Sequence, residues 1–194
     1  MTKPISKDWI HPYLEHGLDV ANRRIFLTDH VEDDLINKII RGIYLMETKS
    51  DSKPIELFVS SYGGDIFAMF GLYDVLRTIN CPVNTIAFGK CMSAAVLLVA
   101  AGTVGERYTT PNCAFMVHDF SADDMTGKIE YIKNDLKNLE YWRDKWAELM
   151  ASHTKQPKKF WLKMCNRSGD HFFTSQQAVD YGVVDIIWDQ KESS

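Results

Sequence analysis

The chain has 194 residues, of which 45% are hydrophobic and 25% are charged, and its net charge is −4 at pH 7. This length and composition are typical of one globular domain that buries a sizeable core. The acidic balance argues against nucleic acid as a partner, because no basic stripe is present to neutralise phosphates. No apolar run approaches the roughly 18–20 residues that a membrane-spanning helix needs, so no membrane contact is expected.

Residues 1–23 are polar and aromatic without a clear period, and we expect an N-terminal arm, or axial segment, with a short helix around residues 12–22. Residues 24–194 are expected to form a single domain in which strands alternate with helices. The predicted elements up to residue 118 are strands at 24–27, 55–60, 83–88, 106–109 and 114–118, and helices at 31–46, at 66–79 and from about 93. Near the C-terminus they are a helix at 157–166, a turn at 168–171, a capped helix from 174, and a turn and strand at 181–187. The alternation predicts βαβ units around a mainly parallel sheet, an α/β fold.

One long helix is predicted over residues 126–153, because apolar residues recur there at 3,4 spacing. These residues are Ile129, Ile132, Leu136, Leu139, Trp146 and Met150, and Arg143 fills the one remaining position of the seam. About 28 residues make a rod of roughly 42 Å, which is too long for a core of this size to cover. We therefore expect the helix to pack against another subunit, with a plain surface helix as the alternative.

The four cysteines (Cys81, Cys91, Cys113 and Cys165) lie far apart and include no CxxC pair. This spacing predicts reduced thiols, and neither a disulfide framework nor a metal site. The first nine residues lack the apolar segment of a signal peptide. We therefore expect a cytoplasmic protein.

Two predicted strand ends are marked by glycines, at Gly63–Gly64 and at Gly89. Ligands in such sheets bind at the carboxyl ends of strands, so the two ends are candidate walls of one site. We predict a turn at Gly89 and a helix that opens near Ser93, which would place the Ser93 hydroxyl at the positive end of that helix. A core helix with an incidental serine is the alternative.

A nucleophilic serine needs a base, a group that orients the base, and N–H donors for the oxyanion. Of the six histidines, His118 alone ends an apolar strand, and it is the candidate base. Asp170 is the candidate orienter, and the donors could be the N–H groups of Gly64 and Ala94. Rival orienters that the spacing leaves open are Asp119, Asp123 and Asp124. The residues predict a serine acyl-transfer enzyme.

Several motifs occur in the order and with the spacing of one known family. They are Ser61–Gly64, Gly89–Gly102, Pro111–Asn112, Met116–His118, Gly169–Thr174 and Ala178–Asp185. From about residue 24 to residue 187, the chain resembles the ClpP peptidase family, the proteolytic subunit of Clp protease. The resemblance implies a ClpP/crotonase-like spiral of βαβ units, in which residues 126–153 form a protruding handle helix.

The resemblance also implies a Ser-His-Asp triad, which falls on Ser93, His118 and Asp170, and oxyanion donors at Gly64 and Ala94. The family further implies that the segment after the histidine binds the substrate backbone. In this chain that segment is Asp119, Phe120, Ser121, Ala122 and Asp123. A Clp-type serine endopeptidase that hydrolyses unfolded proteins is therefore the leading functional hypothesis.

The family implies a homo-oligomer of heptameric rings stacked into a tetradecamer, supplied with unfolded protein by a separate AAA+ ATPase. The chain contains no P-loop, so we expect it to bind neither ATP nor another cofactor itself. It departs from the family at Tyr62, Lys90–Met92, Ala95, Asp119–Phe120, Asp123–Asp124 and Gly169. Such departures suit a divergent, phage-encoded or paralogous member. The alternatives are a catalytically weak scaffold subunit of a mixed ring and a crotonase-type acyl-CoA enzyme.

Overall fold

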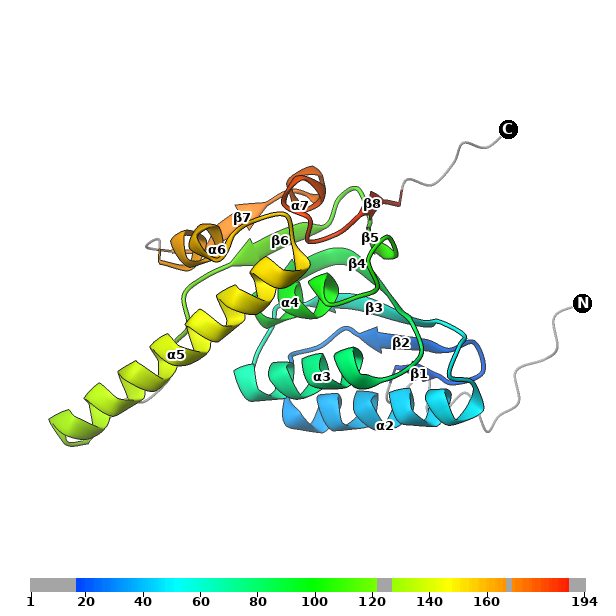
Figure 1. The fold of residues 1–194 in the computed structure, drawn as a ribbon, viewed down its shortest axis with the longest axis horizontal. Coiled ribbons are helices and arrows are strands. Elements are labelled where there is room, and N and C mark those ends of the chain that lie inside the picture. Colours follow the sequence, from blue (N-terminus) through cyan, green and yellow to red (C-terminus); the bar gives the residue numbers. More distant parts are fainter. Residues whose placement is uncertain (1–16, 122–126, 167–168, 189–194) are drawn as a thin grey trace, which may run out of the picture.

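The computed structural model describes residues 17–121, 127–166 and 169–188 (Figure 1). Strands and helices alternate in its first half. The elements there are β1 (Leu18–Asp19), β2 (Arg24–Leu27), α2 (Asp33–Lys49), β3 (Ile55–Ser61), α3 (Ile66–Thr78), β4 (Val83–Met92), α4 (Ala94–Ala100), β5 (Arg107–Thr109) and β6 (Ala114–Val117). The second half contains α5 (Ile129–His153), α6 (Lys158–Cys165), β7 (His171–Phe173), α7 (Ser175–Tyr181) and β8 (Ile186–Ile187).

The strands form one mainly parallel sheet with the order β1-β2-β3-β4-β5-β8, and β6 pairs with both β4 and β7. Only β1 and β7 run antiparallel to their neighbours within the described sheet. Side chains of β3 alternate between buried and partly exposed, because one face of the sheet is covered by helices. The predicted α/β fold of βαβ units is confirmed.

The core lies between the sheet and the helices α2, α3 and α4, which follow one another in contact (Figure 1). All seven residues of α4 are buried, so this helix is the centre of the core. The apolar run after Ser93 therefore anchors the strand-to-helix junction that carries the serine.

Strand β4 does not end at Gly89, where the sequence predicted a turn. It continues to Met92. A β-bulge accommodates the extra residues of β4, because Val59 of β3 pairs with Ala87 whereas Ser61 pairs with Cys91. Gly89 adopts a φ of 64° within this bulge. Beyond it β4 leaves β5 and pairs with β6, so the bulge directs the end of β4 toward the strand that carries His118.

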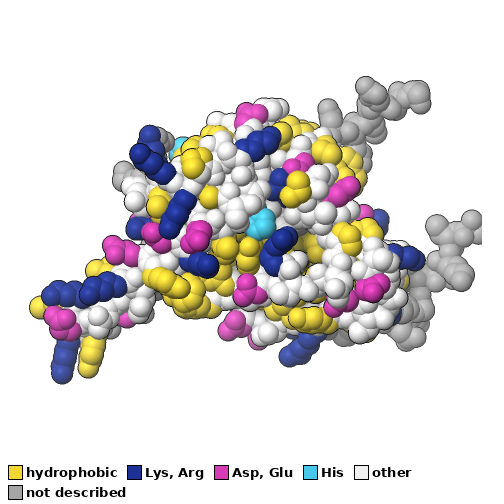
Figure 2. Space-filling view, in the orientation of Figure 1, with side chains coloured by type: hydrophobic (Ala, Val, Ile, Leu, Met, Phe, Trp, Pro, Cys, Tyr) yellow, Lys and Arg dark blue, Asp and Glu magenta, His cyan; other side chains and the backbone are white. Residues whose placement is uncertain are grey.

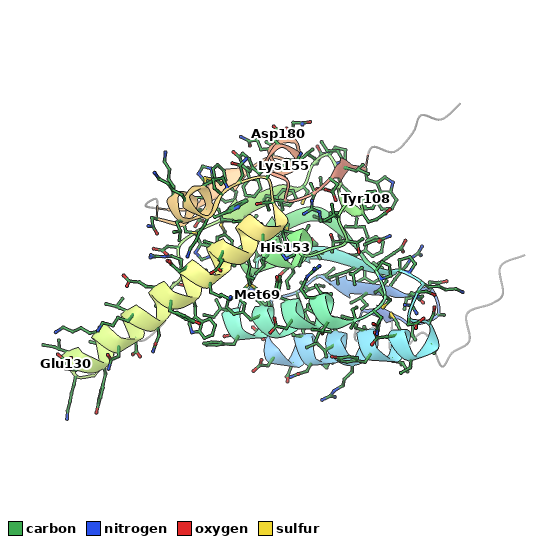
Figure 3. All side chains as sticks on the ribbon, in the orientation of Figure 1. Met69, Tyr108, Glu130, His153, Lys155 and Asp180 are labelled. Carbon is green, nitrogen blue, oxygen red and sulfur yellow. The ribbon has the colours of Figure 1, made fainter. Side chains whose placement is uncertain are left out.

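Helix α5 projects from the body of the molecule at its N-terminal end (Figures 1 and 2). Figure 3 labels Glu130 at the projecting end and His153 at the end against the body. Several large apolar side chains are exposed along the projecting part: Ile129, Tyr131, Leu136 and Tyr141. Near the body Trp146 and Met150 are buried. The helix begins three residues later than predicted, and residues 122–126 lie outside the described part.

Two local predictions were wrong. Of the short helix predicted at 12–22, residues 12–16 lie outside the described part, and Leu18–Asp19 form β1, which pairs with β2. The turn predicted at 168–171 does not extend through His171, because His171–Phe173 form β7 against β6. Both strands are stabilised by pairing with residues distant in sequence, which local patterns do not reveal.

A buried arginine, Arg107, ties the C-terminal part of the chain to the sheet. Its Nε and Nη2 donate to the Asp185 carboxylate at 2.8 and 2.5 Å, and its Nη1 donates to the His153 carbonyl at 2.7 Å. Burial alone raises the pKa of Asp185, but the hydrogen bonds and charge of Arg107 outweigh it and lower the pKa. The pair joins β5, the end of α5 and the segment before β8.

The imidazole of His153 lies beside this pair and is hydrogen-bonded through Nε2 to Tyr73 Oη at 2.9 Å. Burial first, and then the cations Arg77 and Arg107, lower the pKa of His153 to about 4. The ring is therefore neutral in the folded protein near pH 7.

None of the helices in the described ranges is long and apolar enough to cross a membrane.

Candidate active site

Ser93 lies at the junction between β4 and α4, in a strained backbone conformation. Its φ is 52° and its ψ is −121°, a region that residues other than glycine rarely adopt. In the described part of the chain, only Arg23 shares a positive φ among the non-glycine residues. Such conformations cost about 1–3 kcal/mol and concentrate at functional sites. A sharp strand-to-helix turn of this kind exposes the nucleophile in the α/β-hydrolases.

The side chains of Ser93 and His118 meet at the carboxyl edge of the sheet. His118 Nε2 is 2.9 Å from Ser93 Oγ, within hydrogen-bond distance. The register explains the contact, because Met92 of β4 pairs with Met116 of β6 and both strands end next to each other. The backbone N–H of Ser93 also donates to the Met116 carbonyl at 2.8 Å, which fixes the serine beside β6. The pair thus has the distance that proton transfer from a serine requires.

Asp170 lies opposite His118 but is not bonded to it. The antiparallel β6–β7 ladder ends with the pair Val117 and His171, so His118 and Asp170 occupy the next facing positions. Facing residues of such a ladder have side chains on one face, with Cβ atoms about 5 Å apart. In the ranges that the structure describes, however, no hydrogen bond or ion pair joins the two side chains, and Asp170 is exposed.

The structure describes only Asp119 among the rival candidates for orienting His118, and its carboxylate is engaged elsewhere. Asp119 Oδ1 is 3.7 Å from Arg143 Nη1 and accepts a hydrogen bond from the Phe120 N–H at 2.8 Å, so its carboxylate is engaged with α5 and its own turn. Asp123 and Asp124 lie outside the described residues. The position facing His118 belongs to Asp170.

The two predicted oxyanion donors lie at the edge of the same pocket as Ser93. The Gly63–Gly64 turn packs directly on the serine, since a Cβ on Gly63 would come within 2.9 Å of Ala94 N. Val31 holds this turn, donating to the Gly63 carbonyl and accepting from the Asp65 N–H. Among the described groups, neither the Gly64 N–H nor the Ala94 N–H has an acceptor. Both donors are therefore free to bind a developing oxyanion.

A pocket of about 60 Å³ opens beside the serine and the histidine. Its remaining walls are mainly apolar and come from α3, β6, α5 and the segment after His118. They are Ile66, Met69, Val117, Phe120, Ser121 and Trp146. A pocket of this size and lining has room for a small apolar side chain beside Ser93.

The sequence reasoning missed Met69 and Trp146 as members of this pocket. Met69 had no signal beyond its apolar helix position (labelled in Figure 3), and Trp146 was assigned only to the seam of the long helix. Of the predicted substrate segment, Phe120 and Ser121 line the pocket, and Asp119 faces Arg143 instead. Ala122 and Asp123 fall outside the described residues.

The sequence matches known proteins of one family. The family described as Clp protease matches residues 16–191. The chain belongs to the Clp protease family. A curated relative in this family is the "ATP-dependent Clp protease proteolytic subunit" of Deinococcus radiodurans. It is 30% identical over 171 residues, which cover 88% of this chain and 82% of that protein. The resemblance to ClpP read from the motifs is thereby confirmed.

Proposed function

We propose that this Clp protease family member is the proteolytic subunit of an ATP-dependent Clp-type peptidase. It would hydrolyse peptide bonds of unfolded proteins through a Ser-His-Asp triad. The observation that carries the proposal is the 2.9 Å contact between Ser93 Oγ and His118 Nε2, at a strained strand-to-helix turn. The relative named above is itself described as a proteolytic subunit, which supports the same function.

In this proposal His118 acts as general base and then as general acid. His118 Nε2 takes the Ser93 hydroxyl proton as Oγ attacks the peptide carbonyl, and the tetrahedral intermediate carries the negative charge on its oxygen. The same nitrogen then gives the proton to the leaving amine, and the acyl-enzyme forms. Water then attacks the acyl-enzyme. His118 Nε2 takes a proton from the water and returns it to Ser93 Oγ as the acyl group leaves. Each step needs Nε2 and Oγ at hydrogen-bond distance, which is the distance observed.

The N–H groups of Gly64 and Ala94 would stabilise the oxyanion. Both flank Ser93 in the pocket, and neither has an acceptor among the described groups. Donors that are fixed and unpaired before reaction need no reorganisation, and one such donor contributes about 100-fold to 1000-fold in kcat.

Asp170 would orient His118 by accepting a hydrogen bond from Nδ1 in the working enzyme. Its place in the β6–β7 ladder supports this role, because a change of side-chain rotamer across a facing pair is enough to make the contact. The bond is not formed in the single subunit, and this observation favours a second candidate, a scaffold subunit with little activity of its own.

The assembly belongs to the proposal as well. Ile129 and Leu136 expose 71% and 47% of their surface on α5, and a second heptameric ring in a tetradecamer would cover them. A separate AAA+ ATPase would unfold the substrates, so that this chain itself binds no cofactor. We place this activity in the cytoplasm.

The proposal is tested with a denatured fluorescent protein and a short fluorogenic peptide as substrates. We expect the purified protein to hydrolyse the peptide, and Ser93→Ala to abolish hydrolysis while leaving the assembled mass unchanged. The scaffold is separated from the peptidase by a fluorophosphonate probe located by mass spectrometry. An assembled ring whose Ser93 is never modified would support the scaffold and reject the peptidase.

A further inference from the structure

One cation lies beside the candidate active site without a full set of partners. Arg143 of α5 exposes only 20% of its side chain, and its Nε is buried without a hydrogen-bond partner among the residues that the structure describes. Its Nη1 is 3.7 Å from Asp119 Oδ1, and its Nη2 is 3.9 Å from Asp144 Oδ1. These distances allow electrostatic attraction but exceed those of direct hydrogen bonds. A buried donor left unpaired costs free energy, so its position requires a physical reason.

The two residues that follow His118 contact α5, Asp119 through Arg143 and Phe120 through Trp146 one turn further along. Asp119 is held by Arg143, and the Phe120 ring lies 6.3 Å from the Trp146 ring in an edge-on contact. Asp119 Oδ1 also accepts a hydrogen bond from the Phe120 N–H, which couples the two contacts. The segment that leaves His118 is therefore fixed to α5 at two successive residues.

The charges of this pair also reach other groups nearby. Burial first, and then Asp119, raise the pKa of the Cys165 thiol on α6, whereas Arg143 lowers it, and the pKa is about 12. Asp119 adjoins His118 in the chain, and Arg143 is the cation paired with Asp119.

We propose that Arg143 is a positioning residue for His118: through its ion pair with Asp119 it fixes the segment after the histidine to α5. An ordinary surface ion pair contributes little to stability and needs no buried guanidinium. Here the arginine interrupts the apolar seam of α5 at the one place that faces Asp119. The inference rests on the proposed function, in which His118 is the base.

The effect follows from the geometry. Without Arg143, the segment after His118 loses one of its two contacts with α5, so the imidazole is held less firmly against Ser93 Oγ. Without the Asp119 carboxylate the same contact is lost, so the two single variants and the double variant should have the same effect. Contacts that act independently of each other would instead add in the double variant.

The test measures the rate of fluorophosphonate labelling at Ser93 in the full-length protein as assembled. Arg143→Met keeps the apolar stem of the side chain, and Asp119→Asn keeps the shape of an exposed one. We expect labelling to be about three to ten times slower in each single variant, and no slower in the double variant than in either of them.

Arg143→Lys should restore most of the labelling rate, since it keeps the charge opposite Asp119, and Lys145→Met on the exposed side of α5 serves as a matched control. Single variants that label at the wild-type rate, a double variant in which the two losses add, or an Arg143→Lys protein as slow as Arg143→Met would overturn the role of Arg143. A wild-type protein whose Ser93 is not labelled would reject the proposed function itself, and this inference with it.

Discussion

The substitution Gly63→Ala separates the chemistry of the candidate site from the stability of the fold. Gly63 has a φ of 95°, and a Cβ there would lie 2.7 Å from the Met92 carbonyl oxygen and from Ser93 Cβ. Real Cβ atoms do not approach other atoms this closely, so the glycine turn must move away from the serine. The positive φ adds strain of about 1–3 kcal/mol.

Movement of this turn displaces the Gly64 N–H, and losing one oxyanion donor lowers kcat by about 100-fold to 1000-fold. KM should change little, because the donor acts mainly in the transition state. For a domain of this size, each kcal/mol of lost stability lowers the midpoint of thermal unfolding by about 2–4 °C. The midpoint should therefore fall by no more than about 12 °C. The fold therefore survives at room temperature while activity is lost.

The assay compares kcat and KM on a fluorogenic peptide with the midpoint of thermal unfolding. Gly71→Ala is the matched control, because a Cβ at that exposed position of α3 meets no atom within 4 Å. Alanine is favoured over glycine inside a helix by about 0.5–1 kcal/mol, so this control should be active and slightly more stable. A Gly63→Ala protein that keeps the wild-type kcat would refute the role assigned to the glycine turn.

Three further results are expected. Asp185→Ala leaves the buried Arg107 guanidinium without its carboxylate, and we expect a loss of about 3–5 kcal/mol in the free energy of unfolding, measured by urea denaturation. Since folding lowers the pKa of His153 to about 4, the unfolded chain binds a proton below about pH 6.5 that the folded chain does not. Stability should therefore fall by about 1–2 kcal/mol between pH 6.5 and pH 4, after allowing for the partial exposure of the ring, and His153→Gln should lack this decrease. Replacing the exposed Ile129 and Leu136 by aspartate should convert double rings to single rings in mass photometry, and an unchanged mass would contradict the proposed contact.

Much of the fold could be predicted because the local signals were strong. The alternation of β3 between buried and partly exposed residues, and the 3.6-residue period of α2, follow from burial on one face. The start of α7 was readable from Thr174, whose hydroxyl accepts from the Gln177 N–H in a full capping box. The secondary structure of these elements is determined by a few residues that are close together in the sequence.

The features that were missed depend on partners far away in the chain. The bulge at Gly89 exists because β4 must leave β5 and join β6, and β7 forms only against β6. Trp146 reaches the pocket because α5 crosses the end of the sheet, and Arg143 meets Asp119 for the same reason. The spacing of apolar residues along a helix does not show which of them line a site.

The candidate site itself was partly readable. Glycine-marked strand ends and one histidine at the end of an apolar strand led to Ser93 and His118, and the structure brings these two side chains together. The strained backbone of Ser93 and the missing bond between His118 and Asp170 became visible only in three dimensions.

The most direct test of the central proposal is covalent labelling of Ser93 by a fluorophosphonate, with the modified residue located by mass spectrometry. The 2.9 Å contact between Ser93 Oγ and His118 Nε2 predicts one adduct per chain at Ser93. It also predicts that His118→Ala slows labelling by at least about 100-fold, the lower range for general-base catalysis. Equal labelling rates in the wild-type and His118→Ala proteins, or an adduct at another serine, would contradict the proposed mechanism.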